Sequence, residues 1–600
     1  MKLVHVLFLL VFTGCSAILL APSPAPLEPR PAIFVPGASF AKGVTNGLSE
    51  ADRRALYSMD QGIHWLPTDV FLSLKRPTDS FGVYDEMFFE RPERLGLAPN
   101  LADPGSELPL GVTSSMDPVP MAGINCSACH TSIIANADGA FFIVDGGSGQ
   151  FAIDRFIEGM IKSLVGTLIN PAEFEAFYQR YRMRAARTNG LLSAVKADNG
   201  TLDDKGLQEK IEEAYESGDI EPVLDVIQAE SPKALRAAVF GAPPSPGELS
   251  SRTGMYLYLA KRFVFFFQQV KYGTPNEGSK VAASGLGRSN PWAVTKKMFG
   301  DHLEYIQPGA EPFAPKIDGG PINTPHVWDH ERQKWIFWTG VVNSMVERNM
   351  AQHIALVTDF EWDTMTTTAK IEQLEAVSKL MRKAKAPAWP ADILGKVDAD
   401  LAAKGKPIFA ARCLKCHDPV ANYKTPGSAE FNYIDVKTDA AYYLGQIEPM
   451  GKYDLFSEVL APMMTKVKAR SQELEGIKDM GPFELGRTPV VWQKPAGNKF
   501  VAKPLAGIWA SAPFLHNGSV PTIDDLLKPA KERPTEFHVG GYVYDAKKLG
   551  FVTDPSDPRA FKLVTSEEGN SNQGHEFPLS DPDRAAVLEF LKAYDADTTF

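Results

Sequence analysis

The feature that most constrains the fold of this chain is a pentapeptide, Cys-x-x-Cys-His, which occurs twice in 600 residues. In this pattern two thiols form thioethers with a porphyrin, and the adjoining histidine binds the iron. The two copies contain four of the five cysteines in the chain. Their residues are Cys126, Cys129 and His130 in the first motif, and Cys413, Cys416 and His417 in the second motif. The sequence therefore predicts two covalently bound c-type haems, with His130 and His417 as iron ligands.

A structural zinc site and a redox-active disulfide are the other interpretations of such cysteines. Zinc would have to join two cysteine pairs that lie far apart in the sequence, and a thioredoxin-like disulfide would need no second copy. The composition, 44% hydrophobic and 22% charged, is that of an ordinary soluble globular protein. A net charge of −11 argues against a nucleic-acid partner, because such a partner requires a basic face.

The N-terminus has the pattern of an export signal. Lys2 precedes an apolar run, Leu3 to Phe12, which is too short to span a bilayer and predicts a signal peptide over residues 1–20. The run ends at Phe12-Thr-Gly-Cys15, which resembles a lipoprotein signal that ends before Cys15, and cleavage among residues 21–26 is the alternative. Both predict an exported protein: periplasmic, anchored to the outer membrane by a lipid on Cys15, or secreted. Residues 21–46 are rich in Pro, Ala and Gly, and predict a flexible tether.

We expect a mainly α fold, with two cytochrome c-like haem domains joined by long loops. A Pro-rich break at 385–391 predicts an N-terminal haem domain, 47–395, and a C-terminal cytochrome c domain, 396–600. Residues 172–240 are charged and favour helices, so they predict a helical insertion in the first domain.

Helical periodicity and capping patterns predict five further helices. The first begins near Leu48, and the next two cover 151–169 and 255–270. The fourth covers 397–409 and leads into the second motif, and the fifth begins at Leu579 near the C-terminus. The segment 255–270 is rich in Tyr and Phe, which is typical either of a core or of the wall of an apolar pocket.

The sixth ligand of each iron decides its chemistry, because a haem with two strong protein ligands transfers electrons and an open haem binds dioxygen or peroxide. His575 is the best candidate for the second haem. It lies in a polar, glycine-rich loop just before the C-terminal helix. The alternatives are His516, His538, Met463 and Met464.

The first haem has no equally good candidate for a second ligand. No histidine lies between His130 and His302, and residues 131–156 contain no methionine. Four histidines remain open on the sequence alone: His302, His326, His330 and His353. We therefore expect the first haem to be open and to be the reactive centre.

Residues 509–527, Trp509 to Leu527, resemble a block of the bacterial dihaem cytochrome c peroxidase and MauG superfamily. Several shorter blocks resemble its dihaem oxygenase branch, which includes rubber oxygenase A and the bacterial fatty-acid dioxygenases and diol synthases. These blocks are Asp145-Gly-Gly, Val327-Trp328-Asp329, Trp338-Thr-Gly, Arg348-Asn349, Arg533 to Gly540 and Gly569 to His575.

The resemblance implies that the N-terminal haem, on His130, binds dioxygen and that His417 and His575 both bind the C-terminal haem. It also implies a tryptophan near the two haems. Trp328 is our candidate for this catalytic residue, with Trp335, Trp338 and Trp292 as alternatives.

The leading hypothesis is an oxygenase that inserts dioxygen into an unsaturated lipid or polyisoprene, in a pocket lined by the 151–169 and 255–270 helices. A peroxidase that reduces hydrogen peroxide is one alternative, with Glu158 and Glu347 as candidate acids and a small redox protein as electron donor. A plain electron-transfer dihaem cytochrome is the other.

Overall fold

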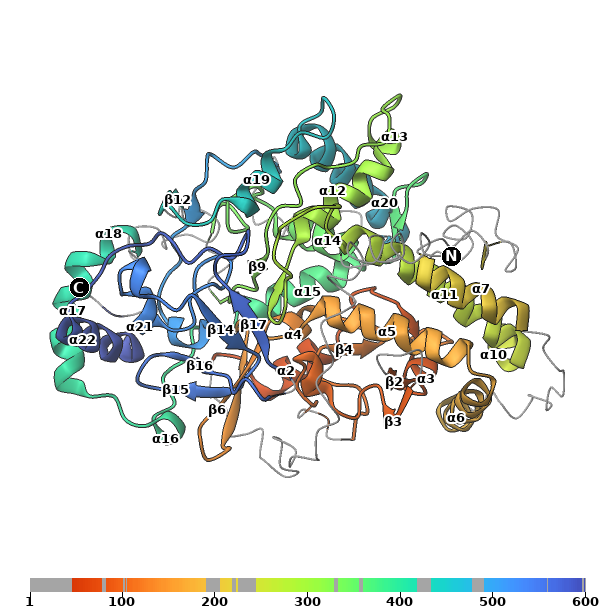
Figure 1. Ribbon diagram of the computed structural model, residues 1–600, viewed down its shortest axis with the longest axis horizontal. Helices are drawn as coiled ribbons and strands as arrows, with labels where there is room; N and C mark the ends of the chain where they lie inside the picture. Colours follow the sequence, from red (N-terminus) through yellow and green to blue (C-terminus); the bar gives the residue numbers. More distant parts are fainter. Residues whose placement is uncertain are drawn as a thin grey trace, which may run out of the picture.

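A computed structural model describes most of the chain (Figure 1). The described residues are 46–598, except 78–82, 101–102, 104, 190–204, 218–222, 225–243, 329–332, 356–359, 418–432, 477–489, 558 and 596–597. The predicted signal peptide and tether, Cys15 and His330 lie outside this range, as does much of the predicted insertion.

Helices account for most of the regular structure in the described residues. The longer ones are α2 (Glu50–Ser58), α5 (Ile153–Leu168), α6 (Pro171–Asn189), α7 (Lys205–Ser217), α11 (Arg252–Gly273), α12 (Pro291–Asp301), α14 (Met345–Ala355), α15 (Ile371–Met381), α17 (Ala399–Arg412), α20 (Ala461–Glu475) and α22 (Asp581–Ala593). The shorter ones are α3 (Thr68–Phe71), α4 (Cys126–Cys129), α10 (Pro246–Ser250), α13 (Leu303–Ile306), α16 (Ala391–Leu394), α18 (Leu414–His417), α19 (Ala441–Ile447) and α21 (Ile523–Leu526), with single turns η2 (Pro92–Leu95), η5 (Leu455–Leu460), η6 (Ile508–Ser511) and η7 (Ala530–Glu532).

The five helices expected from periodicity and capping are confirmed as α2, α5, α11, α17 and α22. Ser49 and Asp52 form a capping box that fixes the start of α2. Ser580 caps α22, and Asp398 caps α17. Helices α6 and α7 lie in the segment that predicted a helical insertion.

Strands are short and form several small sheets. A four-stranded sheet has the order β16 (Gly550–Val552), β15 (Val543–Asp545), β6 (Thr131–Ala135), β7 (Phe141–Asp145), and a three-stranded sheet the order β1 (Leu66–Pro67), β5 (Met121–Ile124), β4 (Val112–Ser114). The two-stranded pairs are β2 (Lys75–Pro77) with β3 (Val83–Met87), β8 (Arg288–Ser289) with β9 (Ile322–Asn323), β10 (Phe360–Glu361) with β11 (Thr366–Thr367), β12 (Tyr433–Ile434) with β13 (Phe500–Val501), and β14 (Glu536–Val539) with β17 (Phe561–Val564). The sequence did not predict the sheets beside the first motif.

The four-stranded sheet combines strands from both sides of residue 395. β6 follows directly after the first motif and pairs with β15 of the C-terminal part, where Val543 lies opposite Ala135. The hydrophobic core cluster around Trp509 likewise contains Ile134, Val144 and Trp328. The N-terminal and C-terminal parts therefore share a core, as the adjoining orange and blue strands of Figure 1 illustrate.

Helix α11 resolves the alternative left open for the aromatic segment. Tyr256, Phe263 and Phe266 are fully buried and pack in one core cluster with Phe156 and Met160 of α5. Neither α5 nor α11 lines the two cavities described below. The apolar faces of the two helices pack against each other in this core, which is the first of the two alternatives for the aromatic segment. None of the described helices is both long and apolar enough to cross a membrane.

Candidate functional site

The first motif lies on α4, whose start is fixed by Asn125. The side chain of Asn125 accepts a hydrogen bond from the backbone of Ser127 at 2.9 Å, and donates to the carbonyl groups of Leu56 at 3.0 Å and Met59 at 3.1 Å. The motif is thereby attached to the loop that follows α2. This attachment orients both cysteines before any group binds to them.

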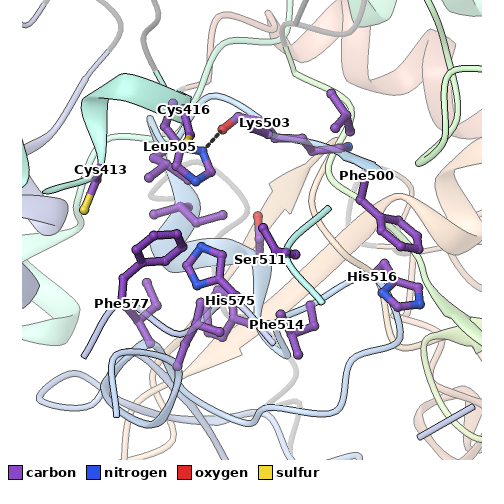
Figure 2. A pocket seen from close by; sticks show the side chains of 18 of the residues that line it. Cys413, Cys416, Phe500, Lys503, Leu505, Ser511, Phe514, His516, His575 and Phe577 are labelled. Atoms are coloured by element: carbon purple, nitrogen blue, oxygen red, sulfur yellow. Dashed lines mark hydrogen bonds between the residues drawn. The ribbon is translucent and has the colours of Figure 1, made fainter. Parts of the chain in front are cut away.

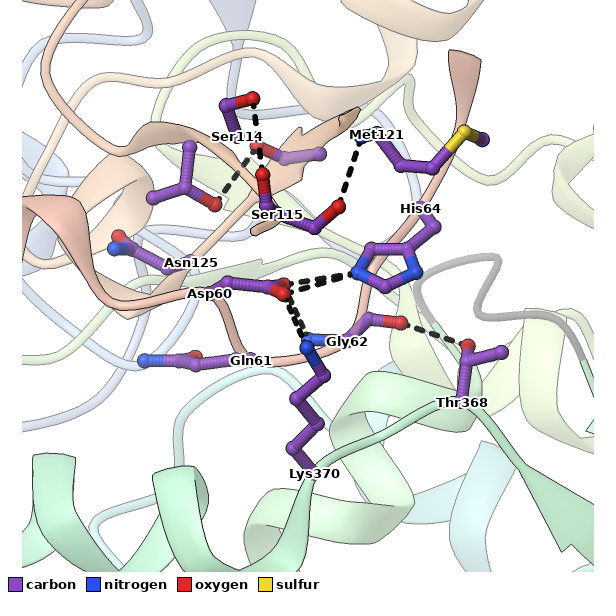
Figure 3. A network of polar contacts seen from close by, with 12 residues as sticks. Asp60, Gln61, Gly62, His64, Ser114, Ser115, Met121, Asn125, Thr368 and Lys370 are labelled. Atoms are coloured by element: carbon purple, nitrogen blue, oxygen red, sulfur yellow. Dashed lines mark hydrogen bonds and ion pairs between the residues drawn. The ribbon is translucent and has the colours of Figure 1, made fainter. Parts of the chain in front are cut away.

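The loop after α2 is itself fixed by a polar network (Figure 3). The carboxylate of Asp60 contacts His64 Nε2 at 3.0 Å and Lys370 Nζ at 2.6 Å. Gln61 accepts hydrogen bonds from the backbone N–H of Cys126 at 3.2 Å and contacts His353 Nε2 at 3.1 Å. The network joins the first motif to the segment that leads into α15.

His130 has its Nδ1 atom 3.0 Å from the carbonyl oxygen of Pro325. Since a carbonyl only accepts, Nδ1 carries the proton and Nε2 keeps the lone pair that a metal requires. Burial, with the nearby Arg348 charge, lowers the pKa of His130 to about 3, so the imidazole stays neutral. His130 is thus prepared to bind iron.

The second motif lies on α18, directly after α17. His417 Nδ1 is 2.7 Å from the carbonyl oxygen of Lys503, the same arrangement as in the first motif (Figure 2). Burial lowers the pKa of His417 as well. Both motif histidines therefore present a neutral Nε2.

His575 lies opposite His417. Its backbone has a left-handed conformation, with φ of 48°, and Gly574 before it has φ of 84°. A Cβ on Gly574 would lie 2.4 Å from the carbonyl oxygen of Val436, so this tight turn requires glycine. Arg533 fixes the loop by donating to the carbonyls of Gly574 at 2.8 Å and His575 at 3.1 Å. Backbone strain of this kind is often found at functional sites.

The distance between the two imidazoles suits a metal between them. The ring centroids of His417 and His575 are 6.2 Å apart. Two metal–nitrogen bonds of about 2 Å each, with ring centres about 1 Å behind the nitrogens, require roughly 6 Å. The Nδ1 atom of His575 is buried without a hydrogen-bond partner among the described residues. The residues present fit a haem with two histidine ligands.

The first cavity extends from this histidine pair to a second end near Phe500 and His516 (Figure 2). It contains about 1400 Å³ of empty space, part of it open to solvent. The residues that line it include Asn323, Pro325, His326, Trp338, Cys413, Cys416, His417, Phe500, Lys503, Leu505, Phe514, His516, His575, Phe577 and Leu591. Most of these side chains are apolar, as is usual for a site that holds a large ligand.

The second cavity lies at the first motif and contains about 570 Å³ of empty space, part of it open to solvent. Its lining residues are Leu56, Cys126, Ser127, His130, Val327, Met345, Arg348, Asn349, Val377, Ser378, Met381 and Arg382. The segment 325–327 separates the two cavities, because Pro325 and His326 line the first and Val327 lines the second. The cavities of the two motifs are therefore adjacent, since consecutive residues of the segment 325–327 line one or the other.

Two buried cations near His130 have no carboxylate partner among the described residues. Arg348 Nη1 donates to Asn349 at 2.9 Å, but its Nε atom has no hydrogen-bond partner in the described part of the chain. Burial and the Arg348 charge lower the pKa of Lys503 to about 7. Buried charges are normally paired, so the site fits an anionic group such as the propionates of a porphyrin.

The alternative ligands for the second haem lie elsewhere. His516 lines the far end of the first cavity and stacks on Phe500 with 4.0 Å between ring centroids. Met463 and Met464 are buried in another core cluster. His538 lies on β14 and does not line the cavity. Of the five candidates, His575 has the geometry of a partner to His417.

The histidines considered for the first haem do not line the second cavity, as far as the described residues show. His302 stacks on Trp362 at 4.5 Å, and His353 contacts Gln61 and the carbonyl of Asn349. His326 lines the first cavity, where Nδ1 is 2.8 Å from the hydroxyl of Ser511. His330 lies outside the described residues.

The tryptophan candidates differ in position. Trp328 is buried, stacks on His326 at 4.3 Å and donates to the carbonyl of Ala506 at 3.1 Å, but it lines neither cavity. Trp338 lines the first cavity, with Lys503 Nζ 5.0 Å from its ring centroid. Trp292 and Trp335 line neither cavity. The catalytic role of Trp328 remains a prediction. Its contact with His326 connects it to the segment 325–327.

The two glutamates considered as distal acids form other contacts. Glu158 pairs with Lys162 at 2.6 Å on α5. Glu347 is buried between Lys468 and Trp492, each at 2.7 Å. In the described part of the chain, no aspartate or glutamate lines either cavity.

Sequence reasoning missed Pro325 and Lys503, whose carbonyl groups orient the motif histidines, and the methionines of the second cavity, Met345 and Met381. The carbonyls carry no sequence signal, because any residue type offers one. The methionines are far from the motif in sequence, and only the fold brings them to it.

Comparison with known proteins supports the haem assignment for part of the chain. A family model described as RoxA-like, cytochrome c-like matches residues 499–538, which include Lys503 and His516. An uncharacterized protein of Sinorhizobium fredii, y4iJ, is 25% identical over 620 residues, covering 91% of each chain. A second one, y4iM, is 27% identical over 328 residues, covering 52% of this chain and 67% of its own. The matched block implies a c-type haem and, in general terms, a haem oxidoreductase.

Proposed function

We propose that this protein is an exported dihaem c-type oxidoreductase in which the two haems have different tasks. The observation that carries the proposal is the asymmetry between the motifs. His417 faces His575 at 6.2 Å, whereas no second histidine lines the cavity of His130 among the described residues. A haem with two imidazole ligands handles electrons, and a haem with one imidazole keeps a position for an exogenous ligand.

The reaction that this arrangement supports best is insertion of dioxygen into an unsaturated lipid or polyisoprene at the first haem. When bound, such a haem supplies dioxygen activation. The chain's own residues would hold its propionates with Arg348, orient His130 through Pro325 and exclude water with apolar walls. Leu56, Val327 and Val377 of the cavity at the first motif offer an apolar surface that suits a hydrocarbon chain.

A peroxide-reducing enzyme has less support. Cleavage of peroxide needs a group that moves a proton near the iron, and both candidate glutamates are engaged elsewhere. A plain electron carrier is favoured by one observation, the presence of Met345 and Met381 in the second cavity. A thioether from either would close the first haem.

Carbon monoxide separates these functions. We expect the reduced protein to bind one carbon monoxide per two haems, with the haem content measured in the same sample. An absence of any spectral change on adding carbon monoxide would exclude both enzymes. Oxygen uptake should then rise with an unsaturated fatty acid or with polyisoprene, and not with a saturated fatty acid of equal length. Turnover of hydrogen peroxide with a reduced cytochrome, without oxygen uptake, would favour the peroxidase.

A further inference from the structure

The supports of the two motif histidines are connected to each other. His130 donates to the carbonyl of Pro325 at 3.0 Å, and His417 donates to the carbonyl of Lys503 at 2.7 Å. The side chain of Lys503 also contacts the segment that orients His130, because its Nζ donates to the carbonyl of His326 at 3.3 Å. His326 directly follows Pro325 in the chain. One residue thus joins the peptide segments that orient both imidazoles.

Lys503 occupies an unusual environment for a lysine. It is 8% exposed, and Figure 2 shows its long side chain crossing the cavity away from Cys416. Its Nζ atom lies 5.0 Å from the ring centroid of Trp338. The described residues offer this amine a carbonyl and an aromatic face, but no carboxylate. An apolar side chain of similar length would fill the same space without the cost of burying a polar group. We therefore expect the amine of Lys503 to have a structural or functional role.

The role of Lys503 follows from its two contacts, one to His417 through its carbonyl and one to His326 through its Nζ atom. The hydrogen bond at Nδ1 sets the ring orientation and the basicity of a metal-bound histidine. If the segment 325–326 moved relative to residue 503, both Nδ1 contacts would change together. The hydrogen bond from Lys503 Nζ to His326 resists that movement.

We infer that Lys503 is a positioning residue shared by the two haem sites, which locks the orientation of His130 to the orientation of His417. This inference rests on the proposed attachment of two haems. It concerns the hydrogen bond that the side chain of Lys503 donates to the carbonyl of His326.

The test compares three variants of the full-length protein with bound haems. Lys503→Met removes the donor and keeps most of the side-chain length and the backbone carbonyl. Lys503→Arg keeps an N–H donor on a side chain long enough to reach the carbonyl of His326. Lys499→Met removes an exposed lysine four residues earlier and is the control. The readout is the electron paramagnetic resonance spectrum of the ferric haems, because its g values depend on the orientation of the axial imidazoles.

We expect Lys503→Met to shift the g values of both haem signals, and Lys503→Arg and Lys499→Met to leave both close to those of the unmodified protein. A shift in only one signal, or none, would overturn the inference, as would equal shifts in the Met and Arg variants, which would show that the donated hydrogen bond does not hold the imidazoles. The haem content is measured first. Fewer than two haems per chain in the unmodified protein contradicts the proposed function itself, whereas two haems with unshifted signals contradict only the role of Lys503.

Discussion

At the scale of single residues, the site depends on side chains that leave a ligand atom free and neutral. The motif histidines achieve this through carbonyl acceptors, and His575 through a left-handed backbone conformation that Gly574 and Arg533 support. The polar groups around the first motif, by contrast, serve to hold the chain. Both kinds of residue can be tested by single substitutions.

Replacing His575 by alanine should open the second haem. Since His575 is the residue that faces His417 at 6.2 Å, its loss leaves the iron with one protein ligand. Carbon monoxide binding to the reduced protein is expected to double, from one to two per chain. His538→Ala, on a strand that does not line the cavity, should leave the stoichiometry unchanged. An unchanged stoichiometry in His575→Ala would show that another residue binds this iron.

Asp60 should make stability depend on pH. Burial opposes ionisation of this carboxyl, but the hydrogen bonds and charges of His64 and Lys370 outweigh burial and hold its pKa well below the usual value. A lowered pKa in the folded state stabilises the protein above the unfolded pKa of about 3.9, and this contribution is lost as the pH falls below it. We expect Asp60→Asn to lower the free energy of unfolding at pH 7 by about 1–3 kcal/mol.

Urea unfolding at a series of pH values measures this difference. The difference in free energy of unfolding between Asp60→Asn and the unmodified protein should become smaller as the pH falls below about 4. Asp435→Asn removes an aspartate that also pairs with a lysine but is more exposed than Asp60, so it should change the free energy of unfolding little at any pH. A difference that stays constant with pH would show that the charge of Asp60 contributes nothing.

The residues of the site were only partly predictable from the sequence. The covalent motifs have a fixed local spacing, and His575 precedes a capped helix in a loop with two nearby glycines, so local patterns identified both. Arg348 and Lys503 approach His130 from positions hundreds of residues away. Their lack of carboxylate partners among the described residues is a property of the folded chain, which no local pattern carries.

At the scale of elements, helices α17 and α22 hold the second motif. Phe409 of α17 packs against Phe590 of α22 and against Tyr594, which directly follows α22, with ring centroids 5.1 and 5.3 Å away. Gly405 allows the close approach, because a Cβ there would lie 2.0 Å from the carbonyl oxygen of Ala586. The periodic apolar pattern predicted both helices, but the close contact depends on a residue that has no side chain.

A methyl group at position 405 should therefore separate these helices. We expect Gly405→Ala to destabilise the protein by at least about 1–3 kcal/mol, the usual cost of overpacking, and to disturb the spectrum of the second haem. Gly206→Ala is the matched control, since its Cβ would meet nothing within 4 Å. It should stabilise α7 by about 0.5–1 kcal/mol. Thermal unfolding measures both, and equal melting temperatures would refute the packing argument.

Helix α11 shows that a pattern of apolar residues can predict a helix without predicting what the helix packs against. Its sequence predicted a helix correctly, yet it is apolar on most of its circumference, and a core and a ligand pocket select the same side chains. The packing partner decides between them. Here that partner is α5, and both helices lie in the core.

At the scale of the whole molecule, the chain on either side of residue 395 forms shared cores. Ile134, Val144 and Trp328 pack with Trp509 and Tyr544, and Phe360 and Leu374 share a cluster with Phe456 and Val467. The Pro-rich break indicated a boundary in the sequence, but apolar contacts across it are a long-range property.

Residues 46–395 should therefore not fold when expressed alone. The fragment would expose the apolar residues that normally contact the C-terminal part, and β6 would lose its partner β15. We expect it to be insoluble, or soluble without a cooperative unfolding transition, whereas residues 46–600 unfold cooperatively. Circular dichroism with denaturant measures this. A soluble fragment with a sharp transition would establish independent domains.

The pairing of β6 with β15 also has a consequence for the order in which the protein is made. Synthesis runs from the N-terminus, so Cys126, Cys129 and His130 leave the ribosome long before Val543 arrives to pair with Ala135. During that interval the sheet beside the first motif has an open edge. A group that binds covalently to the two thiols could therefore be attached while this edge is open, before β15 and β16 complete the sheet.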